Sequence, residues 1–254
     1  MDDGVISEKI KEIAMIDFNI HDLIDTISAN DGMYVAGDTN HYFSVGRSAL
    51  KAIIHSINIA GKKAPNAVLD LPCGHGRVLR YIRAKFPHAS ITACDMDRDG
   101  VDFCVKTFNA EGIYSQRDIR NISLHNKYDL IWCGSLLTHL DKNVWGDFIE
   151  FFSRHLNDQS ILVFTTHGRL CVQRIEGHHT YGLDEKQLPS LLTQYRKTGF
   201  GYLNYSGSSE YGISVASPAY VLAEVQRHLY LKIIFFQEAG WDHHQDVIAC
   251  IRDI

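Results

Sequence analysis

Short apolar runs alternate with helix-like stretches between residues 66 and 166, and this alternation predicts a β-sheet with helices on both faces. Five runs have the length and composition of strands: residues 68–70, 90–95, 113–118, 128–133 and 160–166. Strands that alternate with helices in this way pair in parallel, because each return needs a helical crossover. Two further runs, 231–237 and 246–251, are joined by too few residues for a crossover and predict an antiparallel hairpin.

The regular alternation does not extend to two other parts of the chain. Isoleucine and leucine spacing predicts two short helices between residues 6 and 29, and a longer helix is expected from Arg47 to about Ile59. After residue 166 the chain carries turn glycines and many aromatic residues, with helical patterns at 184–197 and 218–228. We therefore interpret residues 167–230 as an insertion between the fifth strand and the last two.

The stretch from Val68 to Arg77 carries the most chemical information. It reads as a strand that ends on the carboxylate of Asp70 and enters a turn with Gly74 and Gly76, before an amphipathic helix. Glycine adopts backbone angles closed to other residues and lets a ligand approach the main chain. The helix N-terminus beyond the turn adds unpaired N–H groups and a positive dipole end. Such a turn is typical of a nucleoside-type cofactor site at the C-terminal edge of a parallel sheet.

Two further strands are predicted to end on acids. A carboxylate at Asp95 can accept hydrogen bonds from both ribose hydroxyls, and Met96 after it suits an adenine face. The third run ends on Asp118, whose carboxylate could accept the adenine amino group. A dinucleotide fingerprint would have a third glycine where this chain has Leu79, which disfavours NAD.

The pattern Asp-x-x-Cys-Gly-x-Gly at residues 70–76 resembles motif I of the class I S-adenosylmethionine-dependent methyltransferases. The resemblance covers residues 66–166 closely and the last strands more loosely. It implies a Rossmann-like α/β fold, with a doubly wound, seven-stranded, mostly parallel sheet whose last strand is antiparallel. It also implies an N-terminal helical cover at residues 1–65 and a methyltransferase domain at 66–254, with residues 167–230 as a substrate cap. The implied cofactor is S-adenosylmethionine.

The same resemblance implies roles for individual residues. Asp95 would bind the ribose, Met96 and Ile119 would enclose the adenine, and Asp118 would accept from its amino group. Backbone groups of the glycine turn would line the methionine half of the cofactor, with Asp70 supporting the turn. The expected cofactor-binding residues are Asp70, Cys73, Gly74, Gly76, Asp95, Met96, Asp118, Ile119, Cys133, Gly134, Ser135 and Tyr42.

Two histidines are candidates for catalysis. Methyl transfer from a sulfonium needs alignment and exclusion of water, and a base only where the acceptor is a hydroxyl or a protonated amine. His139 follows the fourth strand and His167 the fifth, so each is a candidate base, with a packing role as the alternative. The adjacent histidine pairs at 178–179 and 243–244 lack an i, i+4 partner, so no metal site is expected.

Charge and cysteine content restrict the expected partners. A net charge of −5 without a long basic run gives no support for nucleic acid, and no apolar run approaches the ~20 residues of a membrane span. The six cysteines form no Cys-x-x-Cys pair and indicate buried thiols in a reducing cytoplasm. We expect a small or medium-sized acceptor. Segments 211–214 and 240–247 are similar to bacterial methyltransferases of glycan assembly, which suggests a sugar or glycan precursor.

Two alternatives remain open at this point. One is an NAD(P)-dependent Rossmann oxidoreductase on the same scaffold, and the other is a catalytically silent, methyltransferase-like binding protein. The sequence leaves the methylated atom and the oligomeric state undetermined.

Overall fold

One sheet forms the centre of the molecule in the computed structural model, which describes residues 15–253. Its strands are β1 (Ala67–Asp70), β2 (Ser90–Asp95), β3 (Glu111–Tyr114), β4 (Tyr128–Cys133), β5 (Leu156–Thr166), β8 (Leu231–Trp241) and β9 (Gln245–Arg252). They lie in the order β3-β2-β1-β4-β5-β9-β8. β9 pairs antiparallel with both β5 and β8, and the other strand pairs of this sheet are parallel. The predicted seven-stranded, mostly parallel sheet is confirmed.

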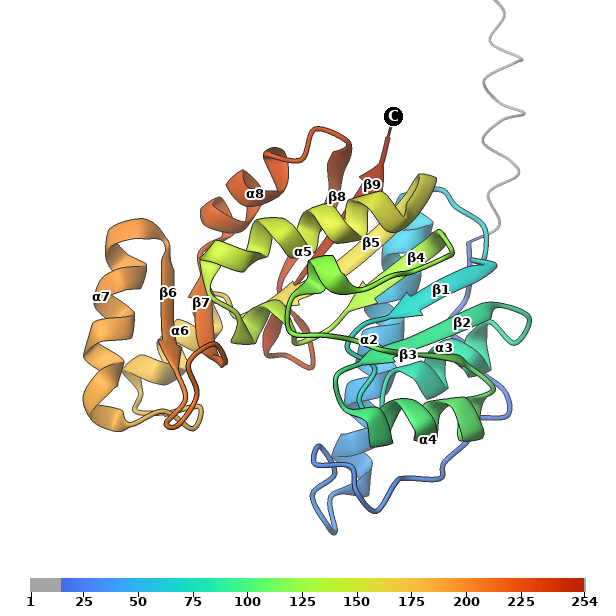
Figure 1. Cartoon of the computed structure of the whole chain (residues 1–254), viewed down its shortest axis with the longest axis horizontal. Helices are drawn as coiled ribbons and strands as arrows, with labels where there is room; N and C mark the ends of the chain where they lie inside the picture. The colour runs from blue at the N-terminus through green and yellow to red at the C-terminus, as the bar shows by residue number, and fades with distance from the viewer. Residues whose placement is uncertain (1–14, 254) are drawn as a thin grey trace, which may run out of the picture.

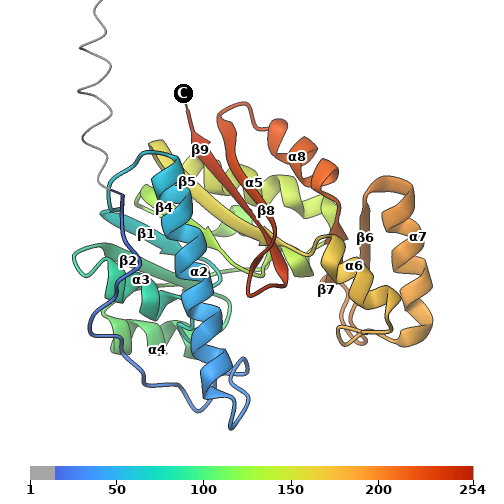
Figure 2. The same cartoon turned by 180° about the vertical axis from the view of Figure 1, so that it is seen from behind.

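Helices cover both faces of this sheet (Figures 1 and 2). One face carries α2 (Thr39–Ile59), α3 (Leu79–Lys85) and α4 (Arg98–Phe108), and the other carries α5 (Lys142–His155) and α8 (Pro218–Gln226). Successive strand residues point to opposite faces, so Val68 packs with the α2 face while Leu69 packs with the α5 face. The central strands β1 and β4 are thus largely buried on both sides, which favours the ends of the strands as the place for a ligand. Across residues 15–253, none of the helices combines the length and apolar character that a bilayer crossing needs.

The chain between β5 and β8 forms a projection that we call the cap. It comprises α6 (Arg169–Glu176), a 3₁₀ turn (Glu185–Gln187), α7 (Leu188–Thr198), β6 (Phe200–Asn204) and β7 (Gly212–Ala216), and α8 leads back to the sheet. Figure 1 shows the cap extending to one side of the sheet. The helices predicted at 184–197 and 218–228 correspond to α7 and α8. The antiparallel pair β6–β7 is a second, separate sheet that the sequence pattern did not predict.

The segment before α2 differs from the prediction. Residues 15–38 contain no helix, whereas the isoleucine spacing predicted helices up to residue 29; residues 6–14 lie outside the described part of the chain. The buried guanidinium of Arg80 donates hydrogen bonds to the carbonyls of Ile24 and Thr26, at 3.0 Å each. Those carbonyls are therefore held by a side chain of α3 instead of by a helical turn. The apolar residues of this segment, such as Ile20, still pack on the core.

Candidate functional site

β1 leads Asp70 directly into the glycine turn that precedes α3. Gly74 and Gly76 have positive φ angles of 48° and 76°, which favour glycine. A Cβ atom on Gly76 would overlap the ring of Phe108, whereas nothing lies within 4 Å of a Cβ built on Gly74. The turn is therefore packed against α4 on one side and open on the other. On that open side a ligand can approach the backbone.

Two acids lie beside the turn. Asp70 is 1% exposed, and neither carboxylate oxygen has a hydrogen-bond partner within the described residues. Burial, and then repulsion from Asp95, raise the pKa of Asp70 well above its usual range. Asp95 accepts hydrogen bonds from the backbone N–H groups of Gly74 at 2.8 Å and Asp97 at 2.9 Å. Each of its oxygens retains a lone pair, which a ribose hydroxyl could use.

The residues predicted around the adenine have different environments. Met96 is 56% exposed and so is open to a stacking base. Ile119 is 2% exposed, and its side chain packs into the core on the α5 face. β3 ends at Tyr114, four residues earlier than predicted, so Asp118 does not end the strand but caps a 3₁₀ turn. Its carboxylate pairs with Arg120 through bonds of 2.8 and 2.9 Å, which lower the pKa of Asp118.

The end of β4 supplies the next predicted contacts. Cys133 is fully buried, and a Cβ on Gly134 would lie 2.8 Å from the indole of Trp132. Ser135 has a φ of 59°, a conformation that is uncommon outside glycine and tends to occur at functional sites. Its N–H donates to Oγ1 of Thr165 at 2.8 Å, so the turn after β4 is held by β5.

Tyr42 and Cys73 are buried beside the turn. Tyr42 is 2% exposed, and its hydroxyl donates to Asp31 at 2.6 Å. The Cys73 thiol donates to the carbonyl of Gly74 at 3.4 Å, so the cysteine faces its own turn. The cofactor contacts assigned to these residues, and to the adenine and β4 residues above, stay predictions.

Arg77 is a residue that the sequence prediction missed. Its half-buried guanidinium lies 5.9 Å from the ring centre of Tyr42 and has no hydrogen-bond or ion-pair partner within residues 15–253. An unpaired arginine directly after the glycine turn could bind a carboxylate of a ligand. Its position next to Gly76 in the sequence was the signal that could have identified it.

The structure brings His139 and His167 together, with ring centroids 6.3 Å apart. Nδ1 of His139 lies 2.8 Å from the carbonyl of Gly212, and Nδ1 of His167 lies 3.2 Å from that of Ser214. Carbonyls two residues apart on a strand point the same way, so β7 orients both rings. Because a carbonyl only accepts, each Nδ1 carries the hydrogen when the ring is neutral, which leaves Nε2 as the acceptor.

Burial determines the charge of these histidines. Burial lowers the pKa of His139, and burial together with repulsion from His244 lowers the pKa of His167 well below its usual range. Both imidazoles are therefore neutral at pH 7. His139 stacks on Tyr211 at 4.8 Å, and burial and the charge of Asp95 raise the pKa of Tyr211. Tyr211 thus stacks on one of the histidines and lies within the electrostatic range of the acid predicted to bind ribose.

Hydrogen bonds also fix the turn after β4 to the sheet. Gln245 accepts from Oγ1 of Thr165 at 2.6 Å and donates to Oγ of Ser135 at 3.0 Å. Thr165 lies in β5, Gln245 in β9 and Ser135 directly after β4, so no local pattern could have grouped them. These bonds hold the turn that precedes His139.

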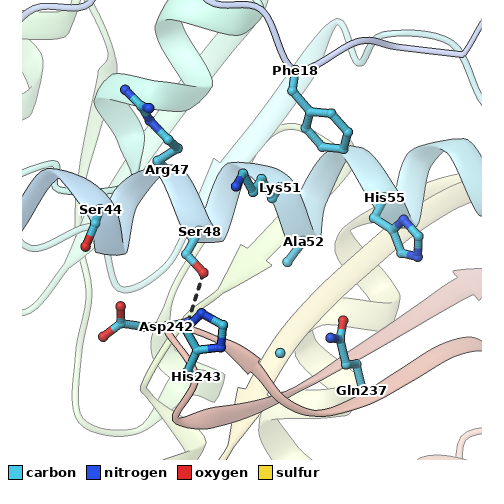
Figure 3. Close-up of a pocket in the computed structure, with 11 residues that line it drawn as sticks. Phe18, Ser44, Arg47, Ser48, Lys51, Ala52, His55, Gln237, Asp242 and His243 are labelled. Atoms are coloured by element: carbon cyan, nitrogen blue, oxygen red, sulfur yellow. Dashed lines mark hydrogen bonds between the residues drawn. The ribbon is translucent and has the colours of Figure 1, made fainter. Parts of the chain in front are cut away.

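A hollow of about 500 Å³ lies elsewhere, between α2 and the β8–β9 hairpin (Figure 3). Ser48 and His55 of α2 and Gln237 of β8 line it, and Figure 3 shows them on facing elements. None of its lining residues belongs to the glycine turn or to the histidine pair. It is therefore separate from the candidate site.

Comparisons with known proteins bear on the family and the fold. The family model described as "Methyltransferase domain" matches residues 68–159. The malonyl-[acyl-carrier protein] O-methyltransferase of Acetivibrio thermocellus is 22% identical over 148 residues, which are 58% of this chain and 50% of that protein. The fatty-acid O-methyltransferase of Mycolicibacterium smegmatis is 31% identical over 71 residues, 28% of this chain and 24% of that protein.

Two solved structures share the fold. An S-adenosylmethionine-dependent methyltransferase from Clostridium acetobutylicum has a TM-score of 0.57 at 13% identity, covering 82% of this chain and 92% of its own. The complex of DhpI with SAH has a TM-score of 0.53 at 16% identity, and the match covers 89% of this chain and 92% of the DhpI chain.

The family match identifies residues 68–159 as a methyltransferase domain, and the fold around it is that of a class I S-adenosylmethionine-dependent methyltransferase. The chain spans about half the length of the malonyl relatives that it matches. The site fits the cofactor of this class on two observations. The unpaired carboxylate of Asp70 suits a ligand with cationic groups, and the open side of Gly74 leaves room for close approach to the backbone.

Proposed function

We propose that this chain transfers the methyl group of S-adenosylmethionine to a hydroxyl oxygen of a small or medium-sized acceptor, a sugar or glycan precursor. The observation that carries the proposal is the pair of neutral histidines, each with Nδ1 fixed by a β7 carbonyl and Nε2 free. A hydroxyl acceptor needs such a base, as a protonated amine also would. Tyr211, which stacks on His139, lies close enough to Asp95 for the charge of that acid to raise the pKa of the tyrosine.

Residues around the turn would hold the cofactor. Asp95 would accept from the ribose hydroxyls, Met96 would lie against the adenine, and Arg77 would pair with the methionine carboxylate. Asp70 would face the positive charges of the methionine half. When bound, S-adenosylmethionine supplies an activated methyl group on a sulfonium sulfur.

His139 would act as the general base. Its Nε2 accepts the proton of the acceptor hydroxyl while that oxygen takes up the methyl carbon, and the electron pair of the broken carbon–sulfur bond remains on sulfur. The hydrogen bond from Nδ1 to Gly212 strengthens as the ring becomes positive. His167, whose ring centroid lies 6.3 Å from that of His139, is the second candidate base.

Aromatic side chains support a sugar acceptor. Tyr205 and Tyr211 lie beside His139, with ring centroids 6.1 and 4.8 Å away, and are 5.6 Å from each other. Each tyrosine offers an apolar face for a sugar ring and a hydroxyl for hydrogen bonding. The relatives named for malonyl and fatty-acid substrates methylate other acceptors, and a carboxylate acceptor would need no base.

The test is methyl transfer from labelled S-adenosylmethionine to a panel of sugars and nucleotide sugars, with malonyl and fatty-acid carboxylates alongside. We expect product only with hydroxyl acceptors. His139→Gln should lower kcat by about 10²–10⁴-fold, the usual contribution of a base, with little change in KM. His178→Gln is the matched control, because His178 is an exposed histidine of the same cap. Methylation of carboxylates alone, or a wild-type kcat for His139→Gln, would contradict the proposal.

Binding of S-adenosylhomocysteine without turnover on any acceptor would instead favour the silent binding protein. Binding and turnover are measured separately, so this result is distinct from a wrong choice of acceptor.

A further inference from the structure

Three potential metal ligands meet where the cap joins the sheet. His167, Cys171 and His244 each offer one ligand atom, and these atoms all lie within 4.8 Å of one another. His167 directly follows β5, Cys171 lies on α6, and His244 lies in the turn between β8 and β9. Three segments that are far apart in the sequence thus converge on one point.

The imidazoles in this cluster are already oriented. His167 is 4% exposed, and its Nδ1 bonds to the carbonyl of Ser214, which leaves Nε2 for a ligand. Metal-binding histidines commonly have such a carbonyl partner on the second nitrogen. The ring of His244 is stacked parallel on Tyr181, 5.6 Å between centroids and 7° between planes. Neither ring therefore needs to be ordered when an ion binds.

The surroundings of the cluster suit a cation. Asp246 is 1% exposed, and its Oδ2 atom has no partner within the described residues. This carboxylate lies against Gly168, the residue between His167 and α6. The Oδ1 atom of Asp246 accepts from the N–H of Ala239 at 2.9 Å. A buried carboxylate oxygen without a partner, such as Oδ2, favours positive charge nearby. The thiolate of Cys171 and the carboxylate of Asp246 together would balance a divalent ion.

The donor types select the ion. Two imidazoles and one thiolate suit zinc and related borderline metals, whereas magnesium and calcium prefer oxygen ligands. Zinc is tetrahedral, so three protein ligands leave a fourth position. The hydroxyl of Tyr181 lies 2.9 Å from Nε2 of His244, and this hydrogen bond must be given up if that nitrogen binds the ion.

We propose that His167, Cys171 and His244 bind one zinc-type divalent ion that joins the cap to the sheet. Cys171 follows His167 by four residues. The sequence prediction considered only adjacent pairs of histidines as metal ligands and therefore missed this spacing. The inference goes beyond the proposed methyl transfer, since it concerns the attachment of the cap. An ion bound to Nε2 of His167 would prevent this histidine from accepting a proton, so that His139 would be the base.

The test uses the full chain, stripped with a chelator and then titrated with Zn²⁺ by calorimetry. We expect one equivalent to bind and the melting temperature to rise. Cys171→Ala and His244→Gln should each weaken binding by more than the roughly 10–100-fold that losing an outer partner of a metal ligand costs. Cys250→Ala and His178→Gln are the matched controls, because both residues lie outside the cluster.

Cobalt gives an independent readout. The wild-type chain with Co²⁺ should show a thiolate-to-cobalt charge-transfer band, and Cys171→Ala should lack it. The band can be measured on wild type alone, so the proposal stays testable if a variant fails to fold. Absence of stoichiometric zinc binding, absence of the band in wild type, or equal affinity for Cys171→Ala would overturn the proposal. Methyl transfer is not used as a readout, so the two proposals fail separately.

Discussion

Alanine at Gly74 and at Gly76 should have two different effects, because the two glycines have different neighbours. Both φ angles are positive, and placing a non-glycine residue there costs about 1–2 kcal/mol. At Gly76 the new Cβ would also overlap the ring of Phe108 and lie 3.1 Å from the sulfur of Cys104. Overpacking of this kind adds about 1–3 kcal/mol, for a total loss of about 2–5 kcal/mol.

At Gly74 the Cβ has free space, so only the backbone cost of about 1–2 kcal/mol applies. The same methyl group would, however, occupy the open side of the turn, where the cofactor approaches the backbone. We therefore expect Gly74→Ala to lose affinity for S-adenosylhomocysteine by more than tenfold. Gly37→Ala is the matched control, because Gly37 also has a positive φ and no atom within 4 Å of its Cβ position.

Urea unfolding followed by tryptophan fluorescence gives the stabilities, and calorimetry gives the affinities. The expected result is a small stability loss in Gly74→Ala and Gly37→Ala and a larger one in Gly76→Ala, with reduced affinity in Gly74→Ala but not in Gly37→Ala. Equal stability losses at Gly74 and Gly76, or wild-type affinity in Gly74→Ala, would refute this reasoning about the turn.

Three further predictions follow from buried charged groups. The pKa of Asp70 is raised in the folded state, so ionisation of this buried acid destabilises the fold as the pH rises. Asp70→Asn removes this cost and should raise the free energy of unfolding at pH 8 by about 1–3 kcal/mol. This gain should vanish as the pH falls toward about 4, where the unfolded acid also protonates; a gain independent of pH in urea titrations would be evidence against it. The lowered pKa of His139 predicts that kcat stays constant as the pH falls through 6.5 and declines only below it, whereas a decline centred above 6.5 would exclude His139 as the base. Arg80→Met should remove the bonds to the carbonyls of Ile24 and Thr26 and lower the free energy of unfolding by about 2–5 kcal/mol. The N-terminal segment should then be cleaved faster by protease, and an unchanged cleavage rate would contradict the role of Arg80 in holding it.

The sheet could be predicted because its signals are local. Each strand is a short apolar run, and the turn after Asp70 is defined by residues that are neighbours in the sequence. The prediction for the N-terminal segment was wrong, because the contact that decides its conformation is not local. Its isoleucine spacing favours a helix, but the guanidinium of Arg80, from an element more than 50 residues away, takes the carbonyls of Ile24 and Thr26.

The candidate site shows the same division. The positions of His139 and His167 after two strands were predictable, because the ends of parallel strands lie at one edge of the sheet. The orientation of their rings was not, since it depends on β7, whose Gly212 lies 73 residues from His139. The pairing of Asp118 with Arg120 also escaped prediction, because the end of β3 at Tyr114 could not be read from the sequence.

Calorimetric titration of the purified chain with S-adenosylhomocysteine tests most directly whether the glycine turn and Asp95 form the cofactor site. We expect one site with a dissociation constant on the order of 1 μM, no binding of NAD, and at least a tenfold loss of affinity in Asp95→Asn. Asp102→Asn, an exposed acid of α4 that bonds only to Tyr114 among the described residues, should bind as wild type does. Absence of S-adenosylhomocysteine binding, or equal affinity in wild type and Asp95→Asn, would contradict this placement of the cofactor.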